Sequence, residues 1–186
     1  MPAKSIPSAT RWSAAGLVLA GVLFQALWLG LPAILVSVGL VVSYLVWMTT
    51  DWTVTQRLRT VFLLTIPVFA AHGLEEFSNG FQQDLPALFG RPPVTGTQFL
   101  VFNGVWMAVF CITALTLRPG RQLPVVIVLF FALVGGVGNG IIHLGLVLRT
   151  GSYFPGAWTA PFCFVVGVWL LKQLYAPGGG SRVPAG

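Results

Sequence analysis

Charged side chains are scarce in this chain of 186 residues. Only 8% of the residues are Asp, Glu, Lys or Arg, and only four are acidic. Soluble domains carry about 25% charged residues, because their surfaces must be solvated. The shortage therefore excludes an ordinary soluble domain and a disordered chain. Together with 56% hydrophobic residues, it is typical of a polytopic membrane protein.

Cysteines are also few, and no run of basic residues occurs. Cys111 and Cys163 both lie inside apolar stretches, where a thiol is a small buried hydrophobic group, so a disulfide-stapled secreted module is excluded. The net charge of +6 comes from single or paired cations beside apolar runs. This distribution indicates membrane loops sorted by charge, and we expect no nucleic-acid partner.

Apolar runs separated by short polar segments predict an all-α, polytopic transmembrane helical bundle of six spans. The first run, Trp12 to Met48, equals roughly 55 Å of helix against a hydrocarbon layer of about 30 Å, so it must fold back. We divide it at Gly30-Leu31-Pro32. The predicted spans cover about residues 13–29, 32–49, 60–79, 97–117, 123–149 and 156–175.

The remaining segments are expected to connect or flank these spans. Residues 1–11 are predicted to be a loose tail, 12–176 a single transmembrane domain, 80–95 a loop rich in Pro and Gly, and 177–186 a disordered tail. No cleavage site follows the first apolar run, so we expect a retained first span rather than a signal peptide.

The distribution of positive charge predicts the orientation. With six spans, eight of the ten Lys and Arg residues lie on the side of the two termini, and only Arg91 and Arg149 lie opposite. The positive-inside rule then places both termini in the cytoplasm.

Polar side chains of four spans are predicted to meet at one level in the outer half of the membrane. At 1.5 Å per residue, His72 lies roughly 10 Å from the outer end of its span, and Asn103 and His143 lie roughly 9 Å from theirs. Asn139, one turn before His143, lies roughly 15 Å deep, and Thr159 lies about 5 Å deep. Nothing in the composition requires this coincidence.

Two adjacent glutamates at this level of the membrane carry a free-energy cost. Glu75 and Glu76 share a sector about 100° wide with His72, and a charge at mid-membrane costs about 2.5–3.5 kcal/mol. They therefore need a metal ion, a protonated histidine or a shared proton as partner. The alternative is that they cap the interface beside Arg91 or Arg149.

Three short motifs carry a resemblance to a known family. The stretches His72-Gly-Leu-Glu75-Glu76, Asn139-Gly-Ile-Ile-His143 and Tyr153-Phe-Pro155-Gly156 occur in this order between about residues 60 and 165. They resemble the HxxEE family of small bacterial and archaeal integral membrane proteins. The resemblance implies a membrane enzyme of undefined activity, in a bacterial cytoplasmic (inner) membrane.

Two imidazoles and two carboxylates at one level suit a divalent ion, Zn²⁺ or Fe²⁺. One glutamate would complete the coordination and the other would act as general base. The candidate metal ligands are His72, Glu75, Glu76 and His143, and the candidate catalytic residues are Glu75, Glu76, Asn139, Asn103 and Tyr153.

Four functional hypotheses use these residues differently. The leading one is metal-dependent hydrolysis of a lipid-like or amphiphilic substrate that enters laterally from the outer leaflet. The second is a metal-free acid/base lipid isomerase. The third is a proton-coupled carrier, and the fourth is a passive structural module. Membrane lipids are expected partners, and the oligomeric state is left open.

Overall fold

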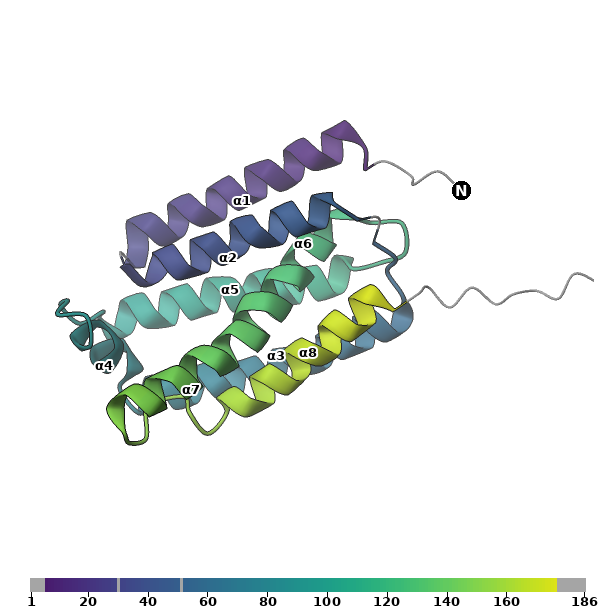
Figure 1. The fold of residues 1–186 in the computed structure, drawn as a ribbon. Helices are drawn as coiled ribbons and strands as arrows, with labels where there is room; N and C mark the ends of the chain where they lie inside the picture. The colour runs from purple at the N-terminus through teal and green to yellow at the C-terminus, as the bar shows by residue number, and fades with distance from the viewer. Residues whose placement is uncertain (1–5, 30, 51, 177–186) are drawn as a thin grey trace, which may run out of the picture.

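The computed structural model describes residues 6–29, 31–50 and 52–176, and these residues form helices joined by turns and loops, with no strand. The predicted fold class is therefore confirmed in its main point. Figure 1 shows the helices side by side, with the first turn of α1 and the last turn of α8 at the same end. The elements are α1 (Ser8–Leu29), α2 (Leu31–Met48), α3 (Gln56–Ser78), α4 (Phe81–Ala87), α5 (Gly96–Thr116), α6 (Leu123–Phe130), the π-helix η1 (Phe131–Gly138), α7 (Asn139–Thr150) and α8 (Ala160–Tyr175).

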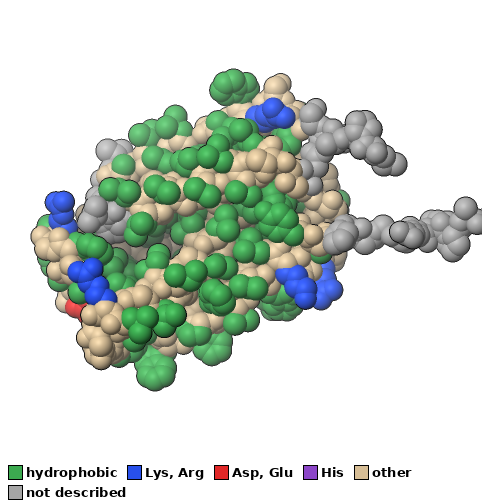
Figure 2. Space-filling view, in the orientation of Figure 1, with side chains coloured by type: hydrophobic (Ala, Val, Ile, Leu, Met, Phe, Trp, Pro, Cys, Tyr) green, Lys and Arg blue, Asp and Glu red, His purple; other side chains and the backbone are tan. Residues whose placement is uncertain are grey.

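Within the described ranges, three helices are long and apolar enough to cross a membrane, namely α3, α5 and the continuous helix Leu123–Thr150. Shorter apolar helices cover Ile34–Met48 and Ala160–Tyr175. Figure 2 shows hydrophobic side chains across the middle of one face and Lys and Arg side chains near its ends. These features indicate a membrane protein, whereas the six-span topology and the side of the termini stay predictions.

Helices α1 and α3 begin several residues earlier than predicted. The predicted tail 1–11 is wrong for its last residues, because α1 starts at Ser8 and the Arg11 amide donates to the Pro7 carbonyl at 3.1 Å. Helix α3 starts at Gln56, since the Thr55 side chain accepts from the Leu58 amide and caps the helix. The predicted tail 177–186 lies outside the described residues.

The segment 80–95, predicted to be a loop, contains the short helix α4. Gly80 at φ +87° turns the chain after α3, and its carbonyl accepts from the amides of Gln83 and Asp84. Pro86 cannot donate to the Gln82 carbonyl one turn earlier, and the Val94 amide donates to it instead, at 2.9 Å. This bond explains why a proline is tolerated there.

The fifth predicted span is one helical rod with a π-helical middle. In η1 the glycine content allows α8 to approach closely, because a Cβ on Gly136 would lie 2.5 Å from the Cα of Gly167. Phe164 packs against Gly140 in the same way, since a Cβ on Gly140 would lie 2.5 Å from the Cβ of Phe164. Small residues at helix contacts and π-helical turns near functional sites are both known features of such bundles.

The sixth helix starts later than predicted. Residues 156–159 form a turn, in which Gly156 has φ +92°, and α8 begins at Ala160 with a proline in its first turn. The loop between α7 and α8 therefore ends beside the side chains of α3, which is where the candidate site lies.

Candidate metal centre

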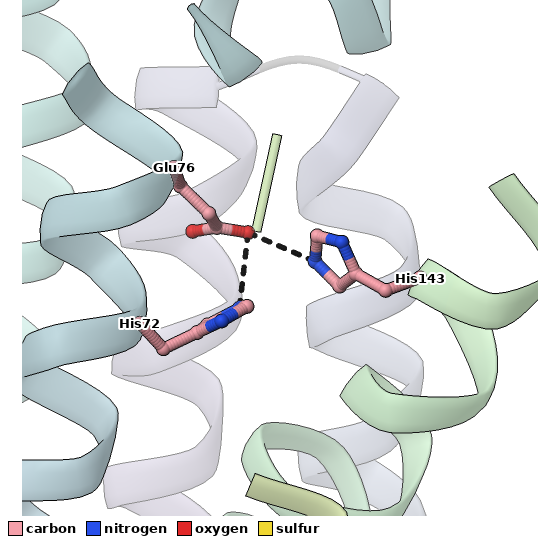
Figure 3. A group of neighbouring side chains, drawn as sticks. All are labelled: His72, Glu76 and His143. Atoms are coloured by element: carbon pink, nitrogen blue, oxygen red, sulfur yellow. Dashed lines mark hydrogen bonds and ion pairs between the residues drawn. The ribbon is translucent and has the colours of Figure 1, made fainter. Parts of the chain in front are cut away.

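Three side chains from two helices meet at one point near the end of the bundle. Glu76 Oε1 lies 3.1 Å from His143 Nε2 and 3.3 Å from His72 Nε2. Both histidines are 1% exposed and Glu76 is 8% exposed. Figure 3 shows that His72 and Glu76 project from α3 towards His143 on α7. The structure thus joins two histidines that are 71 positions apart in the chain (143 − 72).

The spacing of these atoms suits a divalent ion. With metal–ligand bonds of 2.0–2.1 Å in a tetrahedral site, neighbouring ligand atoms are about 3.3–3.4 Å apart. Ligand-type atoms of His72, Glu76 and His143 all lie within 4.8 Å of one another. Two imidazoles and one carboxylate form a ligand set used by catalytic Zn²⁺ sites and by non-haem Fe²⁺ sites.

The hydrogen bonds of Thr159 determine which nitrogen of His72 carries the proton. Its hydroxyl donates to Glu75 Oε2, because an ionised carboxylate can only accept. The same hydroxyl oxygen then accepts from His72 Nδ1, at 2.8 Å. In the neutral ring Nε2 consequently carries a lone pair, and this buried atom has no hydrogen-bond donor. A lone pair facing a carboxylate is repelled by it, and a proton or a metal ion between the two atoms would remove this repulsion.

Glu75 lies outside the group of three. It accepts hydrogen bonds from the Tyr153 hydroxyl at 2.7 Å, the Trp158 amide at 3.1 Å and the Thr159 amide at 2.8 Å, besides the Thr159 hydroxyl. These four bonds use the acceptor capacity of a carboxylate. Although Glu75 is a predicted metal ligand and general base, the structure places it as the anchor of the loop that holds Thr159.

Tyr153 lies in the loop between α7 and α8, outside the helical spans. Burial, together with the hydrogen bond to Glu75 and its charge, raises the pKa of this phenol from 10.0 to about 12. The phenol therefore remains a proton donor to Glu75 at neutral pH. Its contact with Glu75 places this predicted catalytic residue on the loop rather than at the His72–Glu76–His143 centre.

The backbone of Gly156 closes one side of the centre. A Cβ at this position would lie 2.9 Å from His72 Cε1 and 2.9 Å from Glu76 Cγ, and it would also overlap His143 Cε1. Only glycine fits, and its positive φ is a second reason. The loop thus packs directly on all three side chains.

A cavity of about 380 Å³ opens on the other side of the centre. His72, Glu76 and His143 all line it, so a metal ion bound by them would be reached from the cavity. The remaining polar lining side chains are Gln82, Asn103 and Asn139, and the rest of the wall is apolar, aromatic or glycine.

The two predicted asparagines lie in this wall. The Asn103 amide donates to the Phe99 carbonyl of its own helix at 3.0 Å, and Asn139 Nδ2 is buried. Both side chains line the cavity. Among the described residues, neither forms a hydrogen bond with His72, Glu76 or His143.

Sequence reasoning missed the roles of Thr159 and Gly156. The depth of Thr159 was a usable signal, since it matches the level of His72, but its bridge between Glu75 and His72 depends on the turn at 156–159. Gly156 belongs to a recognised motif, yet its packing against the centre follows only from the three-dimensional structure.

A comparison with known protein families gives a match. A family model described as "Protein of unknown function with HXXEE motif" matches residues 62–170, more than half of the chain. No curated protein matches, and no solved structure matches.

Proposed function

The chain belongs to the HXXEE family, and from that membership and the site geometry we propose that it is an integral membrane metalloenzyme. His72, Glu76 and His143 hold one divalent ion, Zn²⁺ or Fe²⁺, in a multi-pass protein of the bacterial inner membrane. The site lies in the outer half of the bilayer. The single observation that carries the proposal is the 3.3 Å contact between Glu76 and the lone-pair nitrogen of His72.

The proposed reaction is hydrolysis of a lipid-like or amphiphilic substrate. When bound, a divalent ion polarises a carbonyl group and lowers the pKa of a water molecule to about 7. Water then adds across the acyl bond: its oxygen joins the carbonyl carbon, the bond to the leaving oxygen or nitrogen breaks, and the proton goes to the leaving group.

The residues of the chain have separate tasks in this proposal. His72, Glu76 and His143 bind the ion, while Thr159 and Glu75 fix the orientation of the His72 ring. Asn139 lines the cavity, and its amide group suits donation to a substrate oxygen. The apolar walls exclude bulk water.

The test is ester hydrolysis by the purified protein in detergent. The protein is stripped with a chelator and reloaded with Zn²⁺ or Fe²⁺, and umbelliferyl dodecanoate is the substrate. His143→Ala should reduce kcat/KM by about a thousandfold, since Lewis-acid catalysis contributes several kcal/mol at 1.36 kcal/mol per tenfold. Asp84→Asn, which changes an exposed acid on α4, is the control. Equal rates for wild type and His143→Ala would refute hydrolysis at this site.

The same contacts favour one second candidate, a metal-free isomerase. Glu76 touches both imidazoles and faces a mostly apolar cavity, an arrangement that suits proton transfer between carbon atoms of a lipid. Substrate-dependent exchange of deuterium from solvent by chelator-treated protein would favour it, because the metalloenzyme loses activity under that condition.

A further inference from the structure

Aromatic rings line the cavity away from the metal centre, starting at Phe69, whose ring centroid lies 6.4 Å from that of His72. Trp106 and Phe130 stack with ring centroids 4.4 Å apart, and Phe69 and Phe110 meet at 5.5 Å. All four residues line the cavity. On α5 the lining runs from Phe99 to Phe110, a length of about 16 Å at 1.5 Å per residue. This elongated apolar space suits a hydrocarbon chain.

The volume limits how many chains fit. Ligand pockets range from about 300 to 1,000 Å³, and the cavity of about 380 Å³ is near the lower limit. One chain can fill it, whereas the two chains of a phospholipid cannot both enter.

At the polar end of the cavity, the lining side chains other than the candidate metal ligands are uncharged. No Lys or Arg is among the described residues that line it. Gln82 Oε1 and His143 Nδ1 are buried there without hydrogen-bond partners, although buried polar atoms are normally satisfied. An amide or hydroxyl carries both the donor and the acceptor that such a set needs, and a phosphate would lack a counter-charge from the chain.

The route into the cavity runs through the apolar flank. Three lining residues are exposed: Leu35 and Val38 on α2 are 64% and 55% exposed, and Ile142 on α7 is 40% exposed. In Figure 1, α5 is seen between α2 and α7, and Figure 2 shows hydrophobic side chains on this face of the molecule.

The end of the bundle nearest the metal centre is covered by Phe81 of α4. Its ring centroid lies 5.5 Å from that of His143, 5.9 Å from Phe154 and 6.3 Å from Phe99. Since this aromatic cover lies over the centre, the flank between α2 and α7 is the open side.

We propose that the ligand of this cavity is a neutral single-chain amphiphile, an acyl amide or acyl ester, that enters laterally from the bilayer between α2 and α7. Its chain lies along α5 towards Trp106, and its carbonyl group meets the metal centre. The inference rests on the proposed function for the chemistry at the carbonyl, but the binding of the chain does not require a metal.

Binding is tested with metal-free full-length protein in bilayer nanodiscs. The probe is N-dodecanoylethanolamine with a diazirine in its chain, and labelled residues are mapped by mass spectrometry of peptides. In wild type, label should concentrate on η1 and on the cavity face of α5. A phosphatidylcholine that carries the same diazirine in one chain should label these residues less.

Matched variants test the route. Leu35→Trp and Ile142→Trp put a larger side chain at the opening, whereas Leu45→Trp on α2 and Ile141→Trp on α7 change exposed residues outside the lining. Cavity labelling should fall about tenfold in the first pair of variants. This decrease corresponds to about two methylene groups of the probe that can no longer be buried in the cavity. Labelling should stay unchanged in the second pair. Because all four positions are exposed, folding should be preserved.

The outcomes separate this inference from the proposed function. Equal cavity labelling in both pairs, or equal labelling by the two-chain probe, would overturn the inference even if metal-dependent hydrolysis were found. Selective labelling in a protein that hydrolyses no ester would uphold the binding site and refute the hydrolase.

Discussion

Glu75 and Glu76 are neighbours in the chain, but they bind different partners. Successive residues on a helix point about 100° apart, so Glu76 faces the two imidazoles while Glu75 faces the loop that carries Tyr153 and Thr159. Each carboxylate therefore has its own set of partners. The double glutamate of the motif consists of one candidate ligand and one residue that fixes the surroundings of another ligand.

Thr159→Val should weaken metal binding without removing any ligand. The substitution deletes the oxygen that accepts from His72 Nδ1, and loss of such an outer partner lowers metal affinity about 10–100-fold. Competition with a chromophoric chelator measures the affinity. Thr116→Val is the control, because the Thr116 hydroxyl bonds only to carbonyls of its own helix. Equal affinities in the two variants would contradict the role assigned to Thr159.

The phenol of Tyr153 should lose its proton at a higher pH than an ordinary tyrosine. Since its pKa is raised from 10.0 to about 12, its hydrogen bond to Glu75 stabilises the fold fully below about pH 10 and is lost as the pH rises towards 12. Ultraviolet absorbance of a Tyr44→Phe/Tyr175→Phe protein, in which Tyr153 is the one tyrosine left, measures this pKa. In that background Glu75→Gln should bring it back towards 10. An unchanged pKa would show that Glu75 does not act on the phenol.

Sequence reasoning expected His72, Glu76 and His143 to lie at one level, as they do in the structure, but it did not separate Glu75 from Glu76. Helical spacing and depth are enough to bring His72, Glu76 and His143 to one level, because α3 and α7 are regular near them. The direction of Glu75 is decided by the turn at Gly156 and by the amides of residues 158 and 159. No local pattern in α3 contains that information.

The loop between α7 and α8 is a structural part of the centre. Through Glu75 it is tied to α3, and through Gly156 it packs on the three candidate ligands. Its position controls how closely His72, Glu76 and His143 can approach.

Gly156→Ala should abolish tight metal binding. The new methyl group would lie 2.9 Å from both His72 Cε1 and Glu76 Cγ, and the rings would have to move. Gly151→Ala is the matched control: Gly151 has φ +66°, so it bears a similar backbone cost of about 1–2 kcal/mol, but no atom lies within 4 Å of its Cβ position. Isothermal titration with Zn²⁺ should therefore show strong binding for Gly151→Ala only. Equal binding would show that the loop does not shape the site.

Close packing of η1 on α8 should make Gly167 indispensable for stability. A Cβ there would lie 2.7 Å from Gly136 Cα, so Gly167→Ala should destabilise the protein by about 1–3 kcal/mol. Gly145→Ala in α7 has no neighbour within 4 Å and should stabilise it by about 0.5–1 kcal/mol. Unfolding in mixed detergent micelles gives both values. The opposite order would contradict close packing between η1 and α8.

Helices α4 and η1 show what composition alone leaves undetermined. Pro86 and the neighbouring glycines favour a loop, but the long-range bond from the Val94 amide to the Gln82 carbonyl stabilises a helix. In η1 the sequence predicts a helix without indicating its π-helical turns, which lie where η1 packs closely on α8. The long apolar helices were predictable because length and hydropathy decide them.

In the molecule as a whole, the buried polar site and the apolar interior occupy different ends of the bundle. At one end of the bundle lie the three candidate ligands and their loop, while towards the other end buried aromatic residues fill the interior. A chain of bonds among Trp47, Trp52 and Gln122 joins α2 to the start of α6 there. The cavity connects the centre with the apolar flank, and this geometry favours chemistry on an amphiphile over transport along the bundle.

The most direct test is the metal content of the purified protein. Inductively coupled plasma mass spectrometry of protein expressed in metal-supplemented cells should find about one Zn or Fe ion per chain. His72→Ala, Glu76→Gln and His143→Ala should each carry almost none, whereas Asp84→Asn should match wild type. Wild-type protein with no more metal than His143→Ala would contradict the metal centre on which the account depends.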